Sequence, residues 1–98
     1  MIAQVRLYTI NRGKMESWIE LFNQRLAPIH EKYGMKIGGA WVYKPMNEFI
    51  WLRVFDTPEE EKARTEAYFS LPERVAVDLP AQHIAKTEVR ISEFVHAS

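Results

Sequence analysis

The stretch EFIWLRVFD, residues 48–56, decides the fold, because it is a predicted strand with apolar residues on both faces. Successive side chains of a strand point to opposite sides. One side carries Ile50, Leu52 and Val54, and the other carries Phe49, Trp51, Arg53 and Phe55. A sheet with one face in water alternates apolar and polar residues instead. This strand therefore predicts a sheet that is covered on both sides.

Three further segments have strand patterns. Residues 2–10 (IAQVRLYTI) alternate, with Val5, Leu7 and Thr9 on one face and Gln4, Arg6, Tyr8 and Ile10 on the other. Residues 36–43 (KIGGAWVY) are joined to the 48–56 strand by a short, turn-rich link, which predicts a hairpin. Gly38-Gly39 indicates a bulge or a close backbone approach in this segment. Residues 87–95 (TEVRISEFV) alternate as well and predict the last strand.

Two helices are predicted between the strands. From Lys14 to Tyr33, apolar residues recur every three or four positions, as on one face of a helix. Pro28 removes a backbone donor and should kink this helix or divide it into two segments. The second helix starts after Thr57, which can form a capping box with Glu60. Its buried face is expected to consist of Ala63 and Ala67, with Tyr68 and Phe69 near its end.

The predicted order of elements is β-α-β-β-α-β, in one domain spanning residues 1–98. This is the split arrangement of ferredoxin-like α+β domains, whose antiparallel sheet carries both helices on one face. The other face needs a cover, because the 48–56 strand is apolar there too. A second copy can supply that cover about a two-fold axis, so we predict a homodimer. The alternative cover is residues 70–86, folded back over the sheet.

Composition and motifs exclude several classes of function. The 13 basic residues balance the 13 acidic ones, so nothing favours nucleic acid or a membrane as a partner. The chain contains no cysteine, phosphate-binding glycine loop, nucleophile elbow or HExxH motif. Glu93 and His96 would face opposite sides of a strand, which disfavours a metal site. We expect no cofactor and no metal, and the absence of a signal-peptide pattern predicts a cytoplasmic protein.

Several segments resemble the NIPSNAP family. They are residues 5–10 (VRLYTI) followed by Gly13-Lys14, residues 26–34 (LAPIHEKYG), residues 39–41 (GAW), Asn47, and residues 55–57 (FDT) before an acidic helix start. The resemblance covers roughly residues 3–75 and fades through 76–98. It implies a dimeric α/β barrel, in agreement with the argument from the sheet.

The resemblance implies little chemistry, because the family has no general reaction assigned. Its wider structural superfamily includes cofactor-free monooxygenases, haem-degrading enzymes and isomerase-like proteins, and a shared fold does not transfer a reaction. Many members have a His-Leu-Trp run in the third strand, where this chain has Trp51-Leu52-Arg53. A role that depends on a strand histidine is therefore not carried over.

The candidates for ligand binding are Arg6, Tyr8, Trp41 and Arg53. The two arginines lie within strands, and on a covered face they could bind a carboxylate or phenolate. The alternative for them is an ion pair with Glu48, Glu88 or Glu93. The aromatic rings could line a pocket for a flat ligand or pack between two sheets.

His30 and Tyr8 are the candidates for catalysis. His30 could carry a proton near neutral pH. Its alternative role is structural, with a partly charged imidazole at the negative end of the first helix. His83 is expected to be a solvated loop residue.

The sequence leaves open whether the protein is an enzyme. The first hypothesis is a homodimeric domain that binds a small apolar or aromatic molecule between its sheet and helices. The second is a cofactor-free monooxygenase or isomerase-like enzyme, with His30 or Tyr8 as the base. The third is a protein-interaction module that uses the outer helices of the dimer.

Overall fold

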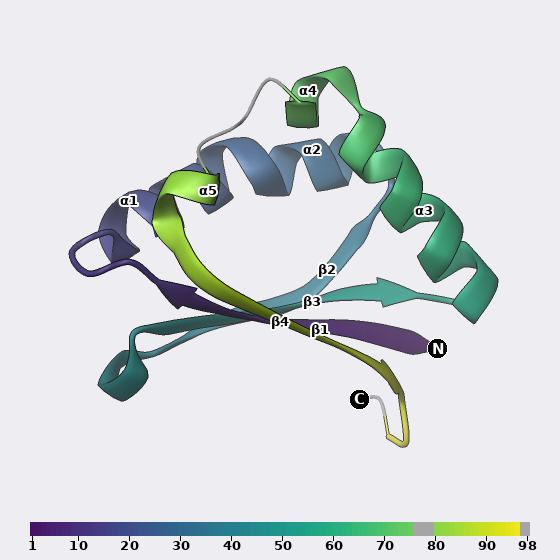
Figure 1. Cartoon of the computed structure of the whole chain (residues 1–98). Helices are drawn as coiled ribbons and strands as arrows, with labels where there is room; N and C mark the ends of the chain where they lie inside the picture. The colour runs from purple at the N-terminus through teal and green to yellow at the C-terminus, as the bar shows by residue number, and fades with distance from the viewer. Residues whose placement is uncertain (76–79, 97–98) are drawn as a thin grey trace.

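The computed structural model describes residues 1–75 and 80–96. It is built on an antiparallel sheet of four strands in the order β2-β3-β1-β4. The strands are β1 (Ile2–Ile10), β2 (Lys36–Tyr43), β3 (Glu48–Phe55) and β4 (Ile84–Glu93). The helices all lie on one side of this sheet (Figure 1). The arrangement is the ferredoxin-like α+β fold predicted from the sequence.

One long helical stretch connects β1 with β2 and is divided into three segments. These are α1 (Met15–Leu21), the π-helix η1 (Phe22–Leu26) and α2 (Ala27–Lys32). The division predicted at Pro28 is confirmed. Proline has no N–H for the carbonyl four residues earlier and its ring crowds that carbonyl. The carbonyl belongs to Gln24, and the wider π-helical turn accommodates it.

The connection from β3 to β4 contains α3 (Pro58–Ser70), α4 (Pro72–Val75) and α5 (Pro80–His83), while the short 3₁₀ helix η2 (Lys44–Met46) joins β2 to β3. The predicted cap of α3 is confirmed, because the Glu60 backbone N–H donates to Thr57 Oγ1 at 3.1 Å. The predicted buried face of α3 is confirmed for Tyr68 and wrong for the other three residues. Ala63, Ala67 and Phe69 are exposed, and Tyr68 is the buried residue of this helix.

Two predictions about the last part of the chain are also wrong. Strand β4 starts at Ile84 rather than at residue 87, because Ala85 is an extra residue that shifts the register and lets Ile84 pair with Ile10, and it ends at Glu93. His83 is buried rather than solvated. Its Nε2 lies 2.8 Å from Ser17 Oγ, and its ring packs beside Trp18 with the ring centroids 6.1 Å apart.

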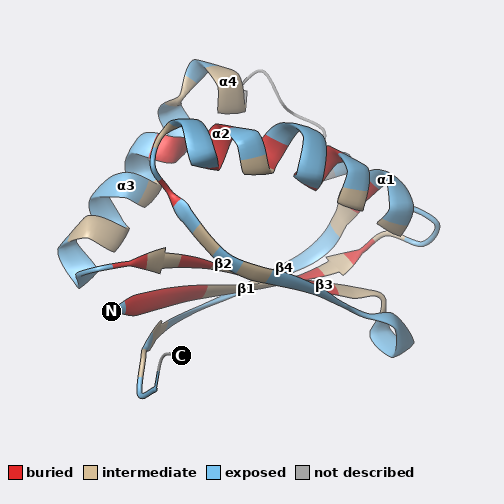
Figure 2. Ribbon diagram, turned by 180° about the vertical axis from the view of Figure 1, so that it is seen from behind, coloured by how far each residue is buried: buried red, intermediate tan, exposed pale blue. Residues whose placement is uncertain are grey.

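The inner face of the sheet, which the helices cover, carries the core. Residues directly opposite each other in an antiparallel pair share a face. Tyr8 pairs with Phe49 and Arg6 pairs with Trp51, so alternate residues of β1 and β3 point towards the helices. Figure 2 shows buried residues along these two strands and on the sheet-facing side of the long helix. The core is therefore a single layer of mostly aromatic side chains between sheet and helices.

The outer face of the sheet is apolar and uncovered within residues 1–75 and 80–96. We define it by Val5 and Leu7 of β1, Trp41 and Tyr43 of β2, and Ile50, Leu52 and Val54 of β3. Trp41 is 53% exposed and Tyr43 is 48% exposed. Helices α4 and α5 lie on the inner side with the other helices (Figure 1), so the prediction that residues 70–86 cover the outer face is wrong for the described part of that segment.

The bulge predicted at Gly38-Gly39 is confirmed. Ile37 pairs with Arg53 and Gly39 pairs with Leu52, which leaves Gly38 as the extra residue. A Cβ atom on Gly38 would lie 2.8 Å from Val54 Cγ2 and 3.1 Å from Leu52 Cδ1. The bulge therefore requires glycine for reasons of space.

Gly38→Ala is expected to lower the free energy of unfolding by about 1–3 kcal/mol, the usual cost of overpacking. Urea unfolding followed by circular dichroism would measure this. The matched control is Gly38→Ala in a Val54→Ala background, where one of the two crowding side chains is gone and the cost should be smaller. An unchanged cost in that background would show that the crowding is not the cause.

Candidate functional site

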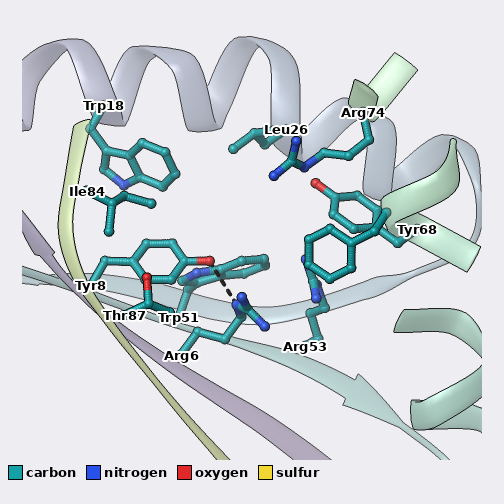
Figure 3. A pocket seen from close by; sticks show the side chains of 11 residues that line it. Arg6, Tyr8, Trp18, Leu26, Trp51, Arg53, Tyr68, Arg74, Ile84 and Thr87 are labelled. Carbon is teal, nitrogen blue, oxygen red and sulfur yellow. Dashed lines mark hydrogen bonds between the residues drawn. The ribbon is translucent and has the colours of Figure 1, made fainter. Parts of the chain in front are cut away.

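A cavity of about 140 Å³ lies between the inner face of the sheet and the helices, and we call it the inner cavity. It is lined by Arg6 and Tyr8 of β1, Trp18 of α1, Leu26 of η1, Trp51 and Arg53 of β3, Tyr68 and Phe69 of α3, Arg74 of α4, and Ile84 and Thr87 of β4. Figure 3 shows these side chains around a common space. Three are arginines, and none is acidic.

Arg53 is held in place by a neutral histidine. Its Nε donates to His30 Nε2 at 2.9 Å, and Arg53 and His30 are both fully buried. His30 Nδ1 lies 2.7 Å from the Leu26 carbonyl oxygen, so Nδ1 carries the proton and Nε2 is free to accept. Burial lowers the pKa of His30 from 6.5 to about 4, and the positive charge of Arg53 adds to the effect. His30 is therefore uncharged at neutral pH.

Two aromatic rings lie close to the Arg53 guanidinium group. Its Cζ lies 4.8 Å from the centroid of the Trp51 ring and 4.5 Å from that of the Tyr68 ring. Such cation–π contacts stabilise a buried cation. Burial lowers the pKa of Arg53 to about 10, and the neighbouring charge of Arg6 contributes in the same direction. Arg53 still carries its positive charge at pH 7.

Gln4 connects the two arginines to the surface of the protein. Gln4 Oε1 accepts from Arg53 Nη1 at 2.8 Å and from Arg6 Nη1 at 3.0 Å. Gln4 Nε2 donates to Glu61 Oε1 at 2.9 Å and to Thr65 Oγ1 at 3.1 Å. An ionised carboxylate can only accept, so Glu61 fixes the amide with its oxygen towards the arginines. Two cations thus share one neutral acceptor.

Arg6 also contacts the aromatic wall of the inner cavity. Its Nε donates to the Tyr8 hydroxyl at 2.8 Å, and its Cζ lies 5.6 Å from the centroid of the Tyr8 ring. Tyr8 in turn meets Trp18 and Trp51 edge-on, with centroid distances of 5.5 and 6.2 Å. Charge and aromatic surface are therefore adjacent in this cavity.

Two buried indole groups of the lining have unused donors. Trp18 is 1% exposed and Trp51 is 2% exposed. Neither Nε1–H has a hydrogen-bond acceptor within the described residues. Buried donors in folded proteins nearly always have partners, so each exception needs an explanation. Both Nε1 atoms are buried, so neither indole N–H is open to the inner cavity.

The structure brings together three of the four predicted ligand-binding residues. Arg6, Tyr8 and Arg53 line the inner cavity, whereas Trp41 lies on the outer face, where its ring packs over Gly39. The ion pairs considered for the arginines do not form, since Arg6 and Arg53 contact Gln4. Glu88 pairs instead with Lys86 and Arg90 on the outer side of β4.

The two candidates for catalysis occupy different positions. Tyr8 lines the inner cavity, but His30 is not part of the lining. The expectation of a charged His30 at a helix end is wrong, because its lowered pKa keeps it neutral. His30 instead holds Arg53 in place.

Four residues of the site were not predicted from the sequence. They are Gln4, Trp18, Tyr68 and Arg74. Gln4 could have been found, because it shares its strand face with Arg6 and Tyr8.

A family model described as NIPSNAP matches residues 3–97 of the chain. The chain belongs to the NIPSNAP family. The match extends to the C-terminal strand, beyond residue 75, where the resemblance noted from the sequence faded. None of the curated proteins matches the chain.

Solved structures of NIPSNAP proteins have the same fold. An uncharacterised NIPSNAP domain protein from Burkholderia xenovorans is 19% identical with a TM-score of 0.85, over 100% of this chain and 96% of that one. A NIPSNAP family protein from Agrobacterium tumefaciens is 20% identical with a TM-score of 0.89, over 99% of this chain and 88% of that one. A protein from Nitrosomonas europaea named "Putative antibiotic biosynthesis monooxygenase" is 12% identical with a TM-score of 0.73, over 98% and 100%. At these identities the likeness concerns the fold alone.

The described part of the chain has neither a metal-binding cluster nor a membrane-spanning helix. Residues 1–75 and 80–96 contain no group of three or more histidine, aspartate or glutamate residues that could hold a metal ion. No helix in the same ranges is long and apolar enough to cross a bilayer. The cytoplasmic location stays a prediction from the sequence.

Proposed function

We propose that this NIPSNAP chain is a homodimeric domain that binds a small aromatic molecule in the inner cavity. The observation that supports ligand binding is a cavity of about 140 Å³ lined by Tyr8, Trp18 and Trp51 together with Arg6 and Arg53. Small-molecule sites are typically concave and aromatic, with a few polar groups that orient the ligand. The arginines of this lining are such polar groups.

Thr87→Phe is expected to weaken the binding of a single-ring aromatic compound by about ten-fold, because a ring fills space that the ligand needs. Thr87 is an exposed residue of β4 that lines the inner cavity, so the larger side chain does not disturb the core. Tryptophan fluorescence can report binding, since Trp18 and Trp51 line the cavity. Thr87→Ser is the matched control and should bind as the wild type does. Equal binding by Thr87→Phe would place the ligand elsewhere.

The monooxygenase alternative has weaker support. The likeness to the Nitrosomonas europaea protein concerns the fold, and a fold does not carry a reaction. The eleven lining residues in the described part of the chain include no histidine, aspartate or glutamate that could act as a base. His30 lies outside the lining, and both of its ring nitrogens are within hydrogen-bond distance of a partner. Tyr8 is then the candidate base that remains, and its hydroxyl accepts from Arg6.

The partner of the outer face is proposed to be a second copy of this chain. The centre of that face is apolar, with Leu52 and Ile50 of β3 between Trp41 and Val5 of the neighbouring strands. Its β4 edge carries Lys86, Glu88 and Arg90 in alternating charge. These three charges pair with one another on the same strand, so they need no partner from a second copy. A second copy is proposed because its own apolar centre would cover this one about a two-fold axis.

A further inference from the structure

The lining of the inner cavity has an excess of positive charge. Arg6 and Arg53 contribute to it, and none of the described residues of the lining is acidic. Glu61 approaches the arginine pair only through the amide of Gln4. A carbonyl oxygen offers a partial negative charge, which does not balance two guanidinium ions. The site is therefore arranged to take up negative charge from a ligand.

The arginine pair retains donors for such a ligand. The contacts to His30, Gln4 and Tyr8 use the Nε and Nη1 groups of Arg53 and Arg6. A guanidinium group has five N–H donors in a planar fork, so Arg6 retains an Nη2 edge, while Arg53 also bonds the side chain of Tyr68. A carboxylate fits such an edge, because its two oxygens can accept parallel hydrogen bonds.

The size of the inner cavity limits the rest of the ligand. Its volume is about 140 Å³. An apolar cavity of about 150 Å³ in another protein holds one benzene molecule. The rings of Tyr8, Trp18 and Trp51 stand edge-to-face around this space, a geometry that favours a further aromatic ring. A single ring with one small substituent fits, and a fused polycyclic molecule does not.

We propose that the inner cavity selects single-ring aromatic carboxylates, with the carboxylate on Arg6 and Arg53 and the ring against Tyr8, Trp18 and Trp51. The proposal depends on the proposed function, because it names the class of molecule that the same cavity binds. A neutral aromatic would leave the two arginines without a counter-charge. An inorganic anion would leave the aromatic walls without a contact.

The experiment compares benzoate with its neutral isostere benzamide, and with inorganic phosphate, by calorimetry and tryptophan fluorescence at pH 7. Benzoate is expected to bind at least about ten-fold more tightly than benzamide, because it alone compensates the arginine charge. Arg6→Gln should reduce benzoate affinity by about ten-fold or more and leave benzamide affinity within about two-fold. Arg12→Gln, which removes the same charge from an exposed turn, is the matched control and should leave both affinities unchanged.

The outcomes separate this proposal from the proposed function. Equal binding of benzoate and benzamide would overturn the carboxylate selectivity and leave the aromatic pocket intact. Phosphate that binds as tightly as benzoate would show a general anion site and overturn the aromatic part. If neither benzoate nor benzamide binds while the protein is folded by circular dichroism, the proposed function fails together with this inference. Lower benzoate affinity in Arg12→Gln would mean that general electrostatics, rather than the cavity, cause the preference.

Discussion

Replacing Leu52 with glutamate is expected to convert the proposed homodimer into a monomer, with a dissociation constant raised by at least about 100-fold. Leu52 lies in the middle of the outer face, opposite Val5 on one side and Gly39 on the other. A two-fold axis would bring two glutamates into the same apolar interface. Burying and juxtaposing like charges costs several kcal/mol. Sedimentation equilibrium at micromolar concentration would measure the change.

The control for this substitution is Val89→Glu. Val89 is also an apolar strand residue, but it pairs with Arg6 and therefore lies on the inner side of β4, where it is 42% exposed. The Val89→Glu variant should therefore have the same particle mass in solution as the wild type. A wild-type mass of 11.5 kDa, that of a single chain, would contradict the homodimer itself. An undiminished dimer in the Leu52→Glu variant would place the interface elsewhere.

Acidification from pH 7 to pH 4 is expected to lower the free energy of unfolding by about 3 kcal/mol through His30 alone, since one unit of pKa corresponds to about 1.4 kcal/mol. The folded-state pKa of His30 is lowered from 6.5 to about 4, chiefly by burial. Between these values the unfolded chain binds a proton at His30 and the folded chain does not, so stability falls as pH falls. The loss begins near pH 6.5 and is complete near pH 4. Urea unfolding at half-unit steps of pH would trace it.

His30→Gln is the variant that isolates this contribution. A glutamine side chain can still accept from Arg53 and donate to the Leu26 carbonyl, but it does not titrate. Its free energy of unfolding should fall less than that of the wild type between pH 7 and pH 4. His96→Gln removes a histidine near the C-terminus and should keep the wild-type slope. Parallel curves for the wild type and His30→Gln would show that His30 does not cause the acid sensitivity.

The fold could be predicted from the sequence because strand parity and helix periodicity are local signals. The β1 boundaries and the faces of that strand agree with the structure, including the shared face of Gln4, Arg6 and Tyr8. The face of the sheet on which Trp41 lies could not be obtained from the alternation of side chains along β2 alone. Without a bulge, Ile37, Gly39 and Trp41 would all face inwards. The extra residue Gly38 reverses the parity beyond it, so Trp41 points outwards.

The other differences arise from tertiary contacts between distant residues. The inner side of α3 carries Glu61 and Thr65 because they bind Gln4, a polar contact that a search for apolar residues does not detect. His83 is buried because Ser17 and Trp18, 66 and 65 positions earlier, pack against it. The pairing of Arg53 with a neutral histidine likewise joins a strand and a helix that are 23 residues apart. No local pattern encodes such contacts.

The amide of Gln4 orients the arginine pair of the inner cavity without changing its charge. An amide transmits orientation from Glu61 to the two guanidinium groups, but it transmits no net charge. A glutamate at position 4 would accept from the same arginine donors and cancel one of their two charges, but it would lose the bond donated to Glu61 and meet that carboxylate with like charge. The amide nitrogen of this strand residue therefore ties the arginine pair to α3 and leaves both positive charges in place.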